Sequence, residues 1–99
     1  MLSGSCVWWN ESGQRDSCGT IGRGVVDPTR GRVSFDIAHN YGTYCFVLRN
    51  VDGRWMGAAA TAHLTLDVLD GGADGTWELG GSWEEGGVRF RFEATLEPS

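Results

Sequence analysis

The sequence predicts an all-β fold: an antiparallel up-and-down meander of about eight strands that forms a small closed or nearly closed barrel. Turn-forming runs rich in Gly, Asn and Asp recur along the chain, and the segments between them alternate apolar and polar residues. Short strands at a spacing of about 8–12 residues are typical of β-sandwiches and barrels. The 99 residues, 16 of them glycine, are expected to form a single β-barrel domain, 1–99, because so short a chain has no room for a second core.

The turn signals divide the chain into its expected strands. These cover residues 6–10, 20–26, 32–38, 43–49, 54–60, 62–69, 76–84 and 88–97. The last hairpin also has a predicted register. A two-residue turn at Gly86-Gly87 sets Trp83 opposite Phe90 inside the barrel, and the same register sets Glu84 opposite Arg89 outside. Apolar pairs inside and opposite charges outside both favour this pairing.

Residues 57–69 allow two interpretations. The small residues from Gly57 to Ala62, followed by an apolar run that ends at Gly71-Gly72, are compatible with a helix that glycine terminates. The alternation of Leu64 and Leu66 with Thr65 instead favours two strands. We prefer the strands, which bring the expected total to about eight, and eight strands close a barrel that is filled by side chains or holds one small ligand.

Composition excludes several classes of partner. The net charge is −5, so we do not expect the protein to bind the phosphate backbone of nucleic acid. All 8 basic residues are arginine, so the chain has no lysine for Schiff-base chemistry. No apolar run approaches the ~18 residues of a membrane span, and no leader pattern is visible, so we expect no membrane partner. A cytoplasmic location is expected, and a secreted form stays open.

The cysteines and histidines show no metal-binding pattern. Cys6, Cys18 and Cys45 lack the paired spacing of zinc ligands, as do His39 and His63. We therefore expect neither a metal nor a cofactor. A tight turn at 11–13 would set Cys6 opposite Cys18 and allow a disulfide, but free thiols are favoured in a reducing compartment.

The aromatic residues are the strongest functional signal. The side chains expected to line a ligand site are Trp8, Tyr44, Trp55, Trp77 and Trp83. Trp8 and Trp9 are adjacent on one strand and must point to opposite faces, so one of them faces outward.

Two segments resemble a known family. The run "WWNESGQ", with Trp8, Asn10 and Gly13, is similar to the Trp-x-Asn-x-x-Gly-Ser opening of avidin-like, calycin-type barrels that bind biotin, although Gln14 stands where that family has Ser. The run "TWELGGSWEEGGVRFRFEATL" resembles a late hairpin of the same barrels. The resemblance implies a small-ligand-binding barrel in which Asn10 contacts the ligand.

We therefore expect a non-enzymatic protein that holds a small organic molecule in a Trp-lined barrel interior. One alternative is a protein-interaction module or inhibitor whose outer surface includes Trp8 or Trp9, with a protein as partner. Another is a small β-barrel enzyme, an isomerase, cyclase or lyase, that uses His39 with Tyr41 or Tyr44 as catalytic residues. Outward apolar residues at Val47, Met56 and Leu69 are compatible with a homo-oligomer.

Overall fold

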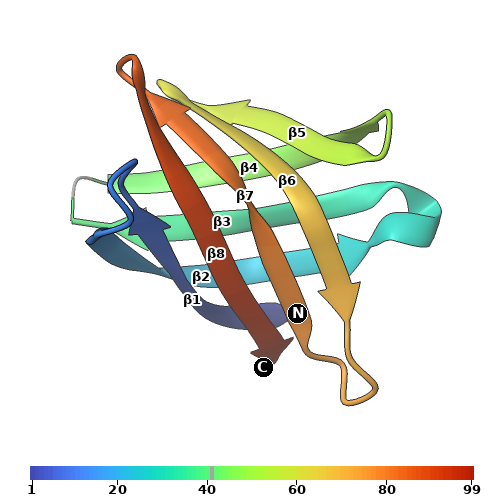
Figure 1. Ribbon diagram of the computed structural model, residues 1–99. Helices are drawn as coiled ribbons and strands as arrows, with labels where there is room; N and C mark the ends of the chain where they lie inside the picture. The colour runs from blue at the N-terminus through green and yellow to red at the C-terminus, as the bar shows by residue number, and fades with distance from the viewer. Residues whose placement is uncertain (41) are drawn as a thin grey trace.

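The protein is a closed antiparallel barrel in which each strand pairs with its neighbours in sequence and the first strand pairs with the last (Figure 1). The computed structural model describes residues 1–40 and 42–99. The strands are β1 (Leu2–Trp9), β2 (Arg15–Asp27), β3 (Arg32–His39), β4 (Gly42–Val51), β5 (Arg54–Ala59), β6 (Ala62–Gly71), β7 (Trp77–Glu85) and β8 (Val88–Pro98). A short 3₁₀ turn, η1 (Pro28–Arg30), joins β2 to β3. The predicted fold class is confirmed.

The ambiguous segment forms strands, so the helical interpretation of residues 57–69 is wrong. β5 and β6 meet in a tight hairpin, where Ala59 pairs with Ala62 and Gly57 pairs with Leu64. Alternation decided between the two, because Leu64 and Leu66 both face the core while Thr65 between them does not.

The last hairpin has the predicted register, since Trp83 pairs with Phe90 and Glu84 with Arg89. The first hairpin differs from its prediction by one residue: Cys6 pairs with Gly19, and Cys18 pairs with Val7. A one-residue shift moves a side chain to the other face of the sheet. Cys6 is therefore buried and Cys18 exposed, and both are free thiols. The predicted opposition of the two cysteines is wrong.

The middle of the barrel is filled by apolar side chains. Fully buried residues include Phe35, Phe46, Phe92, Ile37 and Leu96. In the described part of the chain, seventeen buried residues form a single core cluster, which extends from Cys6 on β1 to Leu96 on β8. The side chains of consecutive strand residues alternate between this core and solvent, as a barrel requires.

Close contact between β6 and β7 depends on a glycine. A Cβ atom at Gly81 would collide with the carbonyl oxygen of Thr65 on the neighbouring strand. Gly81 lies between Leu79 and Trp83 on β7, and its missing side chain lets the backbone of β6 come close to β7 at this point. No helix in the described part of the chain is long and apolar enough to cross a membrane.

Candidate functional site

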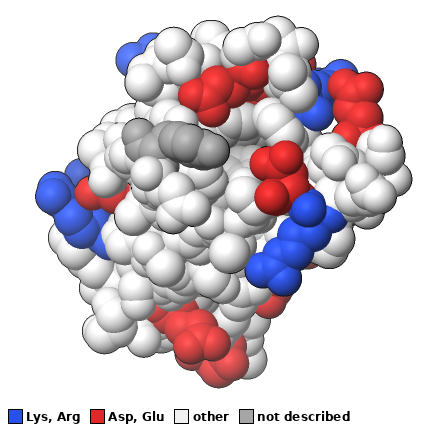
Figure 2. Space-filling model, turned by 90° about the vertical axis from the view of Figure 1, so that its left-hand side faces the viewer, with Lys and Arg blue, Asp and Glu red and all other residues white. Residues whose placement is uncertain are grey.

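One end of the barrel contains a small cavity. We call this end of the barrel the pocket end. It is the end at which β1 is followed by β2, β3 by β4, β5 by β6 and β7 by β8. The cavity has a volume of about 140 Å³ and is lined by Trp8, Asp16, Ser17, His39, Tyr44, Trp83, Glu85 and Phe90. Figure 2 looks onto the side of the molecule where the β1–β2 connection lies, and shows small groups of acidic and basic side chains with uncharged surface between the groups.

Aromatic rings form most of the cavity wall and hold one another by edge-to-face contacts. The rings of Trp8 and Trp83 are 5.1 Å apart at an angle of 84°. Tyr44 meets Trp83 at 5.2 Å and 82°. Such T-shaped pairs are favoured by the charge distribution of the rings and fix their orientation. The wall is therefore preformed by packing within the barrel.

A glycine on β2 makes room for the Trp8 ring. A Cβ at Gly19 would lie 3.1 Å from two carbon atoms of that ring, which is tighter than ordinary contact. The ring is 4 % exposed, and its indole nitrogen is buried with no hydrogen-bond acceptor among the described residues.

Glu85, the last residue of β7, presents a carboxylate to this aromatic wall. It accepts hydrogen bonds from the Tyr44 hydroxyl (3.0 Å to Oε2 and 3.3 Å to Oε1), from Thr61 Oγ1 (2.8 Å to Oε2) and from the Trp83 indole nitrogen (3.2 Å to Oε1). A carboxylate has about four acceptor positions. The three donors occupy about three of these positions, so the side chain is held firmly by three different strand or turn segments.

The surroundings of Glu85 keep it charged. Burial is the strongest single effect on its pKa and raises it, but the hydrogen bonds from Thr61, Trp83 and Tyr44 and the nearby His39 together outweigh burial, so the pKa of Glu85 lies below its ordinary value. The pKa of Tyr44 is raised by burial and by its contact with this carboxylate. Tyr44 is therefore a neutral donor and Glu85 an anion.

A bulge in the first hairpin adds a second carboxylate. Trp8 pairs with Ser17 but Trp9 pairs with Arg15, which leaves Asp16 as an extra residue in β2. Bulges of this kind redirect a side chain and are common beside functional sites. Asp16 lines the cavity and accepts a hydrogen bond of 3.1 Å from the Ser17 hydroxyl.

Three of the predicted ligand-site residues meet in the cavity: Trp8, Tyr44 and Trp83. His39, the predicted catalytic candidate, joins them because it continues the inward-facing series of β3, and its ring meets Trp8 at 5.1 Å. Tyr41 lies outside the described residues.

The remaining predicted residues lie elsewhere. Trp55 and Trp77 sit near the opposite end of the barrel, where β4 turns into β5 and β7 begins; Trp55 is buried and Trp77 half-buried. Asn10 is in the β1–β2 loop, where its side-chain oxygen accepts hydrogen bonds from the backbone nitrogens of Ser12 and Gln14. Its amide oxygen thus stabilises the loop.

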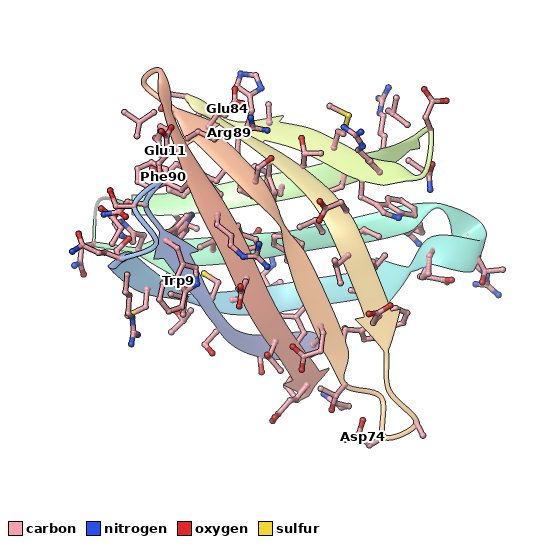
Figure 3. All side chains as sticks on the ribbon, in the orientation of Figure 1. Trp9, Glu11, Asp74, Glu84, Arg89 and Phe90 are labelled. Carbon is pink, nitrogen blue, oxygen red and sulfur yellow. The ribbon has the colours of Figure 1, made fainter. Side chains whose placement is uncertain are left out.

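Trp9 is the outward-facing member of the tryptophan pair (Figure 3). With Asn10, Glu11 and Arg89 it lines a groove of about 830 Å³ on the outside of the barrel. That groove is much larger than the cavity at the pocket end, but exposed charged side chains such as Arg89 make up much of its lining. The smaller cavity combines buried aromatic rings with a fixed carboxylate, and we therefore take it as the candidate site.

Sequence analysis missed Glu85, Asp16, Ser17 and Phe90 as site residues. A signal for Glu85 was present, because Trp77, Leu79, Gly81 and Trp83 all face inward and the same alternation carries Glu85 to the same face. Asp16 had no such signal, because its orientation depends on the bulge. In the described part of the chain, no three His, Cys, Asp or Glu side chains gather as a metal site would require.

Comparison with known proteins gives no relative: no family model, no curated protein and no solved structure matches the chain. The closed barrel of eight antiparallel strands is compatible with a calycin-like fold. Functional inference therefore depends on the chemistry of the site.

Proposed function

We propose that the protein binds a small organic molecule in the cavity at the pocket end. The observation that carries this proposal is the convergence of four aromatic side chains and one ionised carboxylate held by three hydrogen-bond donors on a single cavity: Trp8, Tyr44, Trp83, Phe90 and Glu85. Ligand sites are concave, largely apolar and supplied with a few fixed polar groups, and this cavity has those properties.

The packed interior limits where and what the protein binds. Phe46 and Phe92 fill the barrel beneath the cavity and contact Trp83 at 5.2 and 5.9 Å between ring centroids. The ligand thus occupies the end of the barrel rather than its whole length. A volume of about 140 Å³ suits a compact molecule or one compact group of a larger molecule.

An enzyme is the second candidate, because His39, Tyr44 and Glu85 line the same cavity. A general base works best when its pKa lies near the working pH. The pKa of Glu85 is lowered and its oxygens are already occupied by donors, which makes this carboxylate a weak base. We therefore favour binding, with Glu85 supplying charge rather than accepting a proton.

A blocked cavity tests the proposal. Ser17 lines the cavity, so Ser17→Phe should fill it; Thr20, also on β2 but exposed, provides the control Thr20→Phe. A library of small organic molecules is screened by tryptophan fluorescence and thermal shift, because Trp8 and Trp83 lie in the wall. We expect hits that bind the wild type and Thr20→Phe but not Ser17→Phe. Hits that bind all three equally, or a library without hits, would contradict the proposal.

A further inference from the structure

We infer that the cavity at the pocket end recognises a quaternary ammonium group, such as the trimethylammonium head of a choline-like molecule. The inference rests on the proposed function, since it names the class of ligand that the same cavity takes. Negative charge, occupied acceptor positions and aromatic faces each contribute a separate step of the argument.

The first step is the sign of the charge. Glu85 and Asp16 both line the cavity, and the lining includes no arginine. Among the described residues, the recorded ion pairs join Arg23 to Asp36, Arg30 to Asp27, Arg89 to Glu84 and Arg91 to Glu93. The carboxylates in these four ion pairs are therefore not the two that line the cavity. His39 also lines the cavity, and the two carboxylates leave a net attraction for a cation.

The second step separates quaternary from primary ammonium groups. A primary ammonium must place its N–H donors on acceptors when it leaves water. The two oxygens of Glu85 already accept from Tyr44, Thr61 and Trp83. The Glu85 carboxylate therefore offers charge but about one free acceptor position, and Asp16, which accepts from the Ser17 hydroxyl, is an exposed side chain. A quaternary ammonium has no N–H and needs only the charge.

The third step is the wall itself. A methylated cation is attracted to the faces of Trp, Tyr and Phe rings within about 6 Å. Trp83 and Tyr44 stand nearly perpendicular, at 82°, and Trp8 stands at 84° to Trp83. These rings contact one another, and Trp8, Tyr44, Trp83 and Phe90 all line the cavity, so a compact group held there lies against several of them. The cavity of about 140 Å³ is small enough to keep such a group close to them.

The test compares three probes that share a two-carbon hydroxyl arm, on the wild-type protein, by isothermal titration calorimetry. Choline is the quaternary cation, 3,3-dimethyl-1-butanol is its uncharged isostere, and ethanolamine is the primary amine. We expect choline to bind at least about tenfold more tightly than either of the others, as a desolvated cation–aromatic contact implies. Equal affinity for choline and the uncharged isostere would overturn the cation inference.

Two glutamates adjacent on β7 provide matched variants. Glu85→Gln removes the charge in the cavity and keeps the shape of the side chain; Glu84→Gln removes an exposed charge that pairs with Arg89 outside. Choline affinity should fall about tenfold in Glu85→Gln and stay unchanged in Glu84→Gln, while affinity for the isostere changes in neither. Equal losses of choline affinity in both variants would contradict a local role for Glu85. If Glu85→Gln does not fold, the comparison of probes on the wild type still decides.

Failure of this inference is distinguishable from failure of the proposed function. If choline does not bind but library molecules bind the wild type and not Ser17→Phe, the cavity is a ligand site for another class of molecule. If neither choline nor the library binds, both proposals fail.

Discussion

The packed middle of the barrel and its pocket end shift the pKa values of their ionisable side chains in opposite directions relative to the charged form: the middle disfavours the charged form of Cys6, and the pocket end favours that of Glu85. In the middle, burial raises the pKa of Cys6 to about 12, and a backbone hydrogen bond involving Gly19 offsets only part of that effect. At the pocket end, burial acts on Glu85 in the same direction, but three side-chain donors outweigh it and its pKa is lowered. Burial opposes charge in both regions; the supply of donors decides which group stays ionised.

The two regions also differ in how completely side chains fill them. Phe92 is 0 % exposed in the middle, whereas Phe90, two residues earlier on β8, is half-buried in the cavity wall. Both rings face inward. The difference shows that side chains fill the pocket end less completely than the middle of the barrel.

The largest expected effect comes from truncating one phenylalanine in each of the two regions. Phe92→Ala should lower the free energy of unfolding by about 3–5 kcal/mol, because it leaves a closed void among buried rings. Phe90→Ala, the matched variant, should cost clearly less, because its ring borders a cavity that already exists. Urea unfolding followed by circular dichroism measures both. Equal losses would show that the pocket end is packed as tightly as the middle.

A second prediction concerns alkaline pH. The folded-state pKa of Cys6 is raised, so the unfolded chain loses this proton first and stability falls as the pH rises from 9.0 to about 12. The slope from this single group approaches about 1.4 kcal/mol per pH unit. Cys6→Ala should flatten the dependence relative to wild type, as measured by urea unfolding across this range. Parallel curves for the two proteins would contradict the prediction.

The smallest expected effect tests whether the hydroxyl of Tyr44 stabilises the charge of Glu85. Tyr44→Phe removes one donor, so the pKa of Glu85 should rise and the protein should lose about 1 kcal/mol of stability at neutral pH. The lowered pKa of Glu85 stabilises the folded state at pH values above the ordinary pKa of a glutamate. This contribution is lost as the pH falls through the folded-state pKa. Carboxyl titration by NMR measures the pKa.

A matched control exists on the outer face. Thr95 donates a hydrogen bond of 3.0 Å to Glu78, so Thr95→Val removes a hydroxyl–carboxylate bond of the same kind away from the cavity. The pKa of Glu85 should not change in this variant. A pKa of Glu85 that stays fixed in Tyr44→Phe would mean that the hydroxyl does not stabilise its charge.

Local sequence pattern was enough to predict the class of fold and much of its detail. Alternation and turn residues act over a few neighbouring positions, so the strands and the register of the last hairpin could be derived from them. The inward orientation of Trp83 and Tyr44 followed from the same alternation, which also placed one of Trp8 and Trp9 inside.

The tertiary structure decided what local pattern does not encode. The bulge at Asp16 shifted the first hairpin by one residue, which separated Cys6 from Cys18 and turned a second carboxylate toward the cavity. Closure of the barrel brought Glu85 of β7 within 3.0 Å of the Tyr44 hydroxyl on β4, a contact between residues 41 positions apart. Alternation in the sequence alone determined that one face of each strand is apolar and turns inward; only the closed barrel determined which side chains meet, because that depends on how all eight strands pair and twist.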